Sequence, residues 1–334
     1  MENIDTLKSL LAIPKDIVIV SHRNPDGDAV GSSLALYHYL QQYGHAIKVL
    51  APSEYPDAFG WMPHIEKMMI FDSEPEETAN IVAKAEIIFC LDFNALDRID
   101  KVGEMIEQNK RCKIVMIDHH LYPEPFADYM LSDTTASSTS ELIYDFVELL
   151  GDKEGLNKTI GECMFTGILT DTGSFKYSTS PKLFRIVAEL LELGVDDYVL
   201  QDLIFNTRKE KELRLLGHCL YNRMEILEEY EAGIITLTKE DYVDFDIKRG
   251  DTEGIVNFLL TMQQVKIAAF ISEQPKIVKL SLRSKGDVNV QKIASKYFKG
   301  GGHKNASGGY SFNSLHTTLR RFKEALAERQ AEMT

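Results

Sequence analysis

The sequence predicts an α/β protein with two domains: an N-terminal domain built on a parallel sheet, followed by a smaller C-terminal α/β domain. In the first half, short β-branched runs alternate with helical segments, which is typical of a parallel sheet covered by helices on both faces. From about residue 232 a second alternation of strands and helices begins. A chain of 334 residues has room for two such domains.

Four strands are predicted in the first half, and each is a mostly apolar run of residues. Helices are predicted between and after them, several closed by glycine. Because parallel strands bring their carboxyl ends to one edge of a sheet, we expect a ligand site beyond those ends. The predicted strands are 16–22, 46–50, 87–93 and 112–120, and the predicted helices are 29–44, 80–86, 98–109, 137–151, 158–173 and 181–194.

Residues 196–227 are predicted to continue as helix, with 208–227 a long amphipathic helix of mixed charge that links or packs the domains. We therefore place the first domain at 1–195, a helical linker at 196–227 and the second domain at 228–334. In the second domain the predicted strands are 232–238, 266–272 and 277–284, and the predicted helices are 252–262 and 288–298.

The composition limits the classes of function. The formal net charge of −14 disfavours long nucleic acid as a partner, because phosphates would be repelled by the average surface. The four cysteines are too far apart for a CxxC site, and we expect free, buried thiols in a reducing compartment. The N-terminus does not resemble a signal peptide, and no apolar run is long enough to span a membrane. We expect a cytoplasmic protein without membrane contact.

The stretch "SHRNPDGDAVGSS" directly follows the first predicted strand and contains His22, Asp26 and Asp28. Imidazole and carboxylate groups are ligands for Mn²⁺, Mg²⁺ or Zn²⁺. Aspartates also begin turns and cap helices, so this loop alone leaves the two interpretations open.

Further acidic and imidazole groups end other apolar segments. Asp92 follows the third strand, Asp118, His119 and His120 close the fourth, and Asp171 follows the apolar run "GIL". A solvated strand end or a helix stop explains any one of these residues but not the set. Five carboxylates and three histidines exceed the needs of one divalent ion, whereas two ions about 3.5–4 Å apart that share a carboxylate would use them. Such a pair polarises a phosphoryl oxygen and activates water.

These motifs resemble a known family. "HRNPDGDAVGS", "LDFN", "IDHH" and "TDTGSF" look like the four motifs of the DHH phosphoesterase superfamily, and "SLRSKGDVNVQKIASKYFKGGGHKNASGG" looks like its DHHA1 domain. The resemblance covers nearly the whole chain and is nearest to the stand-alone nano-RNases, which also dephosphorylate 3′-phosphoadenosine 5′-phosphate. It implies a catalytic DHH domain, a substrate-binding DHHA1 domain and an active site in the cleft between them.

The resemblance also implies roles for individual residues. His22 and Asp26 would hold one Mn²⁺, Asp28 and His119 the other, with Asp92 bridging and Asp171 completing the shell. Mg²⁺ and Co²⁺ are alternative ions. His120 would act on a phosphoryl oxygen or leaving group, and Asp118 would orient a neighbouring histidine.

The C-terminal segment qualifies the argument from net charge. Residues 281–323 contain nine Lys or Arg and one acid, so the acidic total hides a basic region. Arg283 suits bidentate phosphate binding, and a glycine-rich run lets backbone N–H groups approach an anion, although it also suits a simple turn. The predicted substrate-binding residues are Arg283, Gly301, Gly302, His303 and Ser307.

The predicted function is therefore a two-metal phosphoesterase that acts on short oligonucleotides and nucleotide bisphosphates. Hydrolysis of a cyclic dinucleotide, or of its linear product, is the nearest alternative. The third hypothesis is a protein that binds nucleotides without catalysis. The sequence leaves open whether the chain forms a homodimer.

Overall fold

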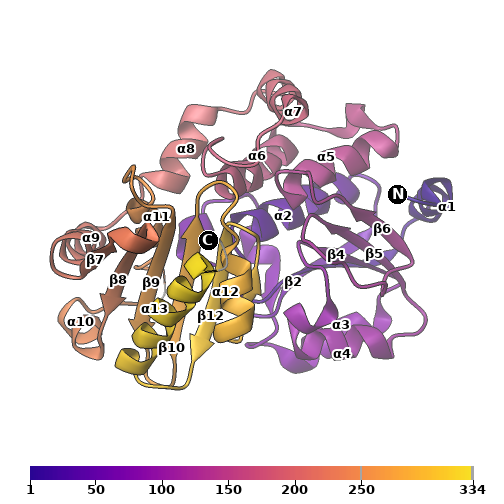
Figure 1. Cartoon of the computed structure of the whole chain (residues 1–334). Helices are drawn as coiled ribbons and strands as arrows, with labels where there is room; N and C mark the ends of the chain where they lie inside the picture. The colour runs from indigo at the N-terminus through magenta and orange to yellow at the C-terminus, as the bar shows by residue number, and fades with distance from the viewer. Residues whose placement is uncertain (249, 332–334) are drawn as a thin grey trace. The chain divides into compact units, whose positions relative to one another are not determined.

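The computed structural model describes residues 1–248 and 250–331, and the chain divides into two compact units between Thr207 and Arg208 (Figure 1). Each unit has its own sheet and its own hydrophobic clusters.

Unit 1 is built on a six-stranded parallel sheet of order β3-β2-β1-β4-β5-β6. The four strands predicted from the sequence are present, and two short strands at the sheet edges, β3 and β6, were not predicted. From β1 the chain builds outward to β2 and β3, then returns to place β4 on the other side of β1. The strands are β1 Asp16–Ser21, β2 Ala46–Ala51, β3 Met68–Ile70, β4 Ile87–Leu91, β5 Lys113–Asp118 and β6 Tyr129–Ser132.

Helices cover both faces of this sheet (Figure 1). Ile17 and Ile19 of β1 pack with α2, α5 and α6, whereas Val18 and Val20 pack on the opposite face with α3 and α4. This alternation buries almost every strand residue, as expected for a parallel sheet. The helices are α1 Ile4–Leu11, α2 Gly27–Gln41, α3 Pro75–Lys84, α4 Lys101–Gln108, α5 Thr139–Leu149, α6 Lys158–Thr172, α7 Pro181–Glu192 and α8 Asp197–Phe205.

Helices α2 and α6 touch through small residues. A Cβ atom on Gly31 of α2 would lie 2.6 Å from the carbonyl oxygen of Cys163 in α6, so only glycine allows this approach. Gly27, at the start of α2, likewise lies against Thr170 near the end of α6. The close packing places the last turn of α6 beside the first turn of α2.

Unit 2 contains a mixed sheet of order β11-β12-β10-β9-β8-β7, in which only the β8–β9 pair is parallel among the described residues. The expected long helix over 208–227 is wrong at its end: α9 stops at Asn222, and Met224–Leu227 pairs with β8 as an edge strand. Contact with β8 overrides the helical pattern there. The elements are α9 Glu210–Asn222, β7 Met224–Leu227, β8 Ala232–Leu237, α10 Lys239–Asp244, α11 Ile255–Leu259, β9 Ile267–Glu273, β10 Val278–Ser284, α12 Val290–Tyr297, β11 Gly301–Gly302, β12 Ala306–Ser311 and α13 Leu315–Ala331.

The two faces of the second sheet are covered unequally. On one face, α12 and α13 pack across strands β8, β9 and β10. On the other face, α9 and α11 form a cluster with β8 and β9, and none of its described members comes from β10 or β12. The other face of β10 and β12 therefore lies outside that hydrophobic cluster.

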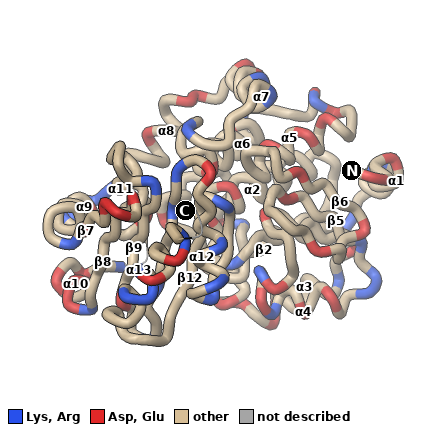
Figure 2. Tube along the Cα trace, viewed as in Figure 1, with Lys and Arg blue, Asp and Glu red and all other residues tan. Residues whose placement is uncertain are grey.

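The four cysteines are free and buried, as the sequence predicted. In the described part of the chain, no helix combines the length and apolar character needed to cross a membrane. Lys and Arg residues gather along α12 and α13, in the segment whose basic composition contrasts with the acidic total (Figure 2).

Candidate metal centre and glycine-rich hairpin

Most of the predicted site residues of unit 1 lie at or just beyond the carboxyl ends of its central strands. His22 comes directly after β1 and Asp92 directly after β4, where the strand order reverses. Ligands of open α/β sheets bind at this kind of reversal. Asp118 ends β5, followed by His119 and His120, and Asp171 lies in the last turn of α6 rather than ending the helix.

One group consists of His22, Asp26 and Asp92, each of which offers a ligand atom within 4.8 Å of the others. The Nε2 atom of His22 lies 3.4 Å from Oδ2 of Asp92 and 4.0 Å from Oδ2 of Asp26. Asp92 is buried and has a φ of 65°, an uncommon conformation for a residue other than glycine. Such backbone strain is concentrated at functional sites.

Asp26 combines the two roles that the sequence left open. Its Oδ1 atom accepts the backbone N–H groups of Asp28 and Ala29 and so caps α2. Its other oxygen, Oδ2, is the atom that faces His22. A capping aspartate therefore also belongs to the candidate site.

A second group consists of Asp28, His119 and Asp171. The Nε2 atom of His119 lies 3.2 Å from Oδ2 of Asp171 and 3.6 Å from Oδ1 of Asp92. Since the two oxygens of Asp92 face His22 and His119 respectively, its carboxylate stands between the two groups.

The histidine rings are oriented in the way that metal sites require. Nδ1 of His22 lies 2.9 Å from the carbonyl oxygen of Arg23, and Nδ1 of His119 lies 3.4 Å from that of Ala136. A carbonyl partner favours the tautomer with the proton on Nδ1, which would leave the lone pair of Nε2 for a cation held among the carboxylates. Two imidazoles and four carboxylates in two adjoining groups fit a pair of hard or borderline divalent ions.

The electrostatics of these carboxylates point the same way. Burial, reinforced by the neighbouring carboxylates, raises the pKa of Asp28 and of Asp171 well above the usual value. Burial alone would raise the pKa of Asp92, but its hydrogen bond with His22 and the nearby histidines lower it overall. For His22, burial is outweighed by Asp92 and Asp26, and the pKa rises to about 9. Such a crowd of buried acids is a setting in which a divalent cation offsets repulsion.

His120 is tied to Asp118. Oδ1 of Asp118 lies 2.7 Å from Nδ1 of His120, and Oδ2 accepts the backbone N–H of the same residue at 3.1 Å. Asp118 is fully buried, and its contact with Nδ1 holds the His120 ring in one orientation. The contact joins Asp118 to a neighbouring histidine, and its role in orienting that histidine for catalysis stays a prediction.

The structure adds residues that the sequence analysis missed. The backbone N–H groups of Thr139 and Ser140, in the first turn of α5, donate to the two oxygens of Asp28 at 2.6 and 2.9 Å. The hydroxyl of Thr139 donates to Oδ1 of Asp92 at 3.0 Å. The run "SSTSE" signals a capped helix start, but nothing in it indicates that this start meets two aspartates.

Gly167 of α6 is a further missed residue. A Cβ atom there would lie 2.0 Å from Oγ of Ser140 and 2.6 Å from Oδ1 of Asp28. Glycine is therefore required at this position for α6 to pack against Ser140 and Asp28.

In unit 2, the predicted substrate residues gather around a glycine-rich hairpin. Arg283 of β10 pairs with Ala306 of β12, and β11, formed by Gly301 and Gly302, pairs with β12. The N–H of His303 donates to the carbonyl of Ala306, which closes the turn. Ser307 differs from the other predicted residues, because it is buried and its hydroxyl donates to the carbonyl of His303.

Comparison with known proteins agrees with this architecture. Residues 16–168 match the DHH family, N-terminal domain, and residues 233–332 match the DHHA1 domain. A bifunctional oligoribonuclease and PAP phosphatase from Thermus thermophilus is 30% identical over 90% of this chain and 85% of its own. A cyclic-di-AMP phosphodiesterase from Listeria monocytogenes is 28% identical over 89% of this chain and 45% of its own.

A solved structure is also similar. The crystal structure of an exopolyphosphatase-related protein from Bacteroides fragilis is 39% identical and has a TM-score of 0.94. The likeness covers 97% of this chain and 95% of that one. Both units are thus represented in a relative of nearly the same length.

Proposed function

Since the chain belongs to the DHH/DHHA1 phosphoesterases, we propose that it is a Mn²⁺-dependent hydrolase of short oligonucleotides and of 3′-phosphoadenosine 5′-phosphate. The observation that carries the proposal is the pair of adjoining His/Asp groups around Asp92. The substrate assignment is supported by the Thermus thermophilus relative, which aligns over most of both chains.

The roles of the residues follow from their atoms. His22 and Asp26 would hold one ion, Asp28, His119 and Asp171 the other, and Asp92 both. Two such ions polarise a phosphoryl oxygen and lower the pKa of a water molecule. Asp118 holds Nδ1 of His120, so that Nε2 is the ring atom that would meet a phosphoryl oxygen or leaving group.

The C-terminal unit would contribute to substrate binding. Arg283 presents a planar guanidinium suited to phosphate, and the backbone of Gly301 and Gly302 can approach an anion closely. His303 adds an imidazole at the same turn. Ser307 would act by holding the carbonyl of His303.

A panel of substrates tests the proposal. Purified protein with Mn²⁺, and separately with Mg²⁺, is incubated with the bisphosphate, 5′-phosphorylated di- to decanucleotides and cyclic di-AMP, and products are followed in time. We expect turnover of the bisphosphate and of the shortest oligonucleotides. If Mn²⁺-loaded protein leaves both classes intact, the proposal is wrong.

Hydrolysis of a cyclic dinucleotide is the second candidate. It is supported by the Listeria monocytogenes relative, whose identity to this chain is similar, although the alignment covers 45% of that protein. Preferential turnover of cyclic di-AMP in the same panel would favour it. A protein that only binds nucleotides would retain binding yet show little turnover in the wild type.

A further inference from the structure

The face of β10 that lies outside the α9–α11 cluster carries polar side chains in strict alternation. Val278, Leu280 and Leu282 are buried against α12 and α13. Lys279 and Ser281 alternate with them and so point to the opposite face, where Lys279 is exposed. Lys279 makes no ion pair with any described residue, so no carboxylate in the described part of the unit offsets its charge directly.

The neighbouring strand β12 continues this face with small and aromatic residues. Ser281 pairs with Gly308, and Lys279 pairs with Tyr310. The ring of Tyr310 meets that of Phe312 edge-on at 5.4 Å between centroids, and Nζ of Lys299 lies 5.1 Å from the Phe312 ring. The two aromatic side chains are 37% and 69% exposed.

The glycines of this region divide into two kinds. Gly300, Gly302 and Gly309 are required by packing, since a Cβ on each would lie within 3 Å of another atom. Gly301 and Gly308 are not, because the nearest described atom would be beyond 4 Å for Gly301 and 3.6 Å away for Gly308. Neither has a positive φ. Their effect is to leave the strand surface flat.

We propose that this surface binds the nucleotides of a single-stranded oligonucleotide beyond the one being hydrolysed, an inference that rests on the proposed function. The β10–β12 strip consists of Lys279, Ser281, Lys299, Gly308, Tyr310 and Phe312. Bases stack on Tyr310 and Phe312, and the two lysines pair with phosphates. Aromatic rings beside unpaired cations on a flat surface are the features that bind single strands without reading sequence.

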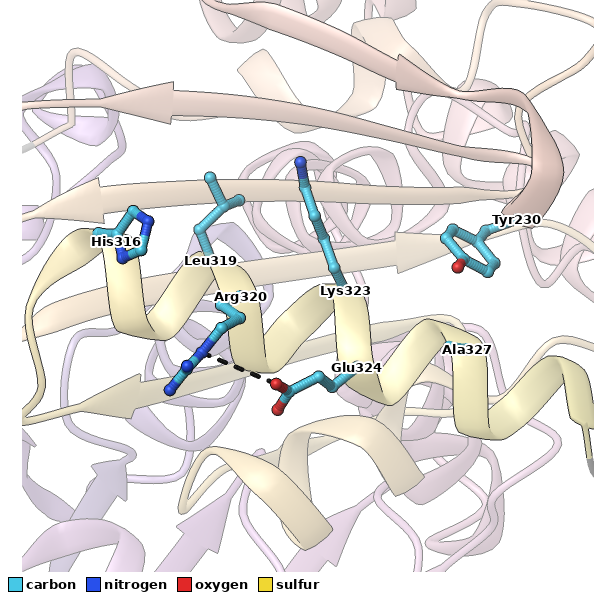
Figure 3. Close-up of a pocket in the computed structure, with 7 residues that line it drawn as sticks. All are labelled: Tyr230, His316, Leu319, Arg320, Lys323, Glu324 and Ala327. Carbon is cyan, nitrogen blue, oxygen red and sulfur yellow. Dashed lines mark ion pairs between the residues drawn. The ribbon is translucent and has the colours of Figure 1, made fainter.

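The hollow beside α13 is the rival surface of unit 2 (Figure 3). Its cations are already engaged: Arg320 pairs with Glu324 at 3.7 Å, and Lys323 pairs with Glu225 at 2.7 Å. Tyr230, at its end, stands apart from these charges (Figure 3). The hollow therefore offers a phosphate less uncompensated charge than the strip does.

The test is fluorescence anisotropy of the full-length protein with a labelled, 5′-phosphorylated hexaadenylate. It is measured in Mn²⁺ with phosphorothioate linkages, which resist hydrolysis, and again in EDTA. Tyr310→Ala should weaken binding about fivefold or more. Tyr310→Phe should retain it, and Lys279→Gln should lower the slope of log Kd against log salt by about 0.7, the value for one phosphate contact with a single strand.

Matched controls lie on α9 and on the loop before β10. Tyr221→Ala removes a tyrosine that is 91% exposed, and Lys276→Gln removes an exposed lysine; neither should change affinity.

Three results would contradict the proposal that the strip binds oligonucleotide. They are a wild type that does not bind hexaadenylate, a Tyr310→Ala variant that binds it as tightly as wild type does, and a Tyr221→Ala variant that loses as much affinity as Tyr310→Ala. A sedimentation coefficient that falls in Tyr310→Ala would also overturn it, because the strip would then be an interface between copies of the chain. If wild type hydrolyses nothing in the substrate panel but hexaadenylate binding depends on Tyr310, the proposed function is wrong, whereas the proposal that the strip binds oligonucleotide is supported.

Discussion

The two sheets of this protein leave different parts of themselves available for function. In unit 1, helices bury both faces of the sheet, and the histidine and aspartate side chains of the candidate centre gather where the central strands end. In unit 2, the α9–α11 cluster covers β8 and β9 but excludes β10 and β12, so part of one face remains for polar and aromatic side chains. Parallel strands need crossover helices on both faces, whereas antiparallel hairpins do not, and this difference decides where each sheet can bind a ligand.

The charges differ in the same sense. Unit 1 concentrates buried carboxylates at the ends of β1, β4 and β5, which suits cations. The segment 281–323 of unit 2 has nine basic residues and one acid, which suits phosphates (Figure 2). A phosphoesterase needs both kinds of surface, because the metals and the phosphate chain carry opposite charge.

The largest effect is expected from removing the carboxylate that joins the two groups. Asp92→Ala should lower turnover at least about 1,000-fold, since several kcal/mol of transition-state stabilisation by the metals would be lost. Calorimetric titration with Mn²⁺ should show fewer or weaker sites.

Asp128→Asn is the matched control for Asp92→Ala. Asp128 pairs with Lys113 and with the N–H of Ile114, at the start of β5 and thus at the opposite edge of the same sheet. Turnover should be close to that of wild type. Equal losses of turnover in the two variants would show that activity does not depend on which ends of the strands carry the aspartate. The proposed difference between the two sheets would then be wrong.

A smaller but still large effect is expected from Gly167→Ala. The added methyl group would collide with Ser140 and Asp28, and a displacement of a ligand by about 1 Å can cost about 100-fold in rate. Gly217→Ala on α9 is the control, because a Cβ there meets no described atom within 4 Å. That change should raise the free energy of unfolding by about 1 kcal/mol and leave Mn²⁺ binding unchanged.

A moderate effect is expected from Thr139→Val, which removes the hydroxyl that donates to Asp92 but keeps the shape of the side chain. Loss of a hydrogen bond to a ligand typically costs about 10-fold to 100-fold in metal affinity, and we expect the lower end because the N–H groups still hold Asp28. Thr139→Ser keeps the hydroxyl and should restore Mn²⁺ affinity. Equal affinity in Val and Ser variants would remove Thr139 from the centre.

The sequence was sufficient to place the residues that end strands. Apolar runs of five or six residues identify β1, β4 and β5, and the polar residues that follow them must meet at one edge. The contacts of Thr139 with Asp28 were beyond prediction, because they join residues 111 positions apart through the approach of α5 to α2. Gly167 was missed for the same reason.

Short edge strands were missed for a different reason. β3 has three residues and β6 four, which is too few for a periodic pattern, and their pairing is decided by the strands beside them. Met224–Leu227 shows the same effect in unit 2, where an edge position beside β8 converts an apparent helix end into a strand. Sequence patterns thus identify the centre of each sheet better than its margins.

The smallest effect on activity is expected on the covered half of the second sheet. Asp241 is buried there and accepts hydrogen bonds from Arg223 and from the N–H of Thr238. Burial would raise its pKa, but Arg223, Thr238 and His218 together lower it below the usual value. A lowered pKa in the folded state means that Asp241 stabilises the fold at neutral pH, and that this stabilisation is lost as the pH falls through that pKa.

Asp241→Asn should therefore lower the free energy of unfolding at pH 7 by about 2 kcal/mol, through loss of charge-assisted hydrogen bonds. In urea titrations followed by circular dichroism, the difference from wild type should shrink below about pH 4, where the aspartate begins to protonate. Mn²⁺ affinity and hexaadenylate affinity should not change in conditions where the variant is folded. The variant could instead weaken oligonucleotide binding as much as Tyr310→Ala does. The part of the sheet inside the α9–α11 cluster and the β10–β12 strip would then not be separate in function, and the proposed difference between the two units would be wrong.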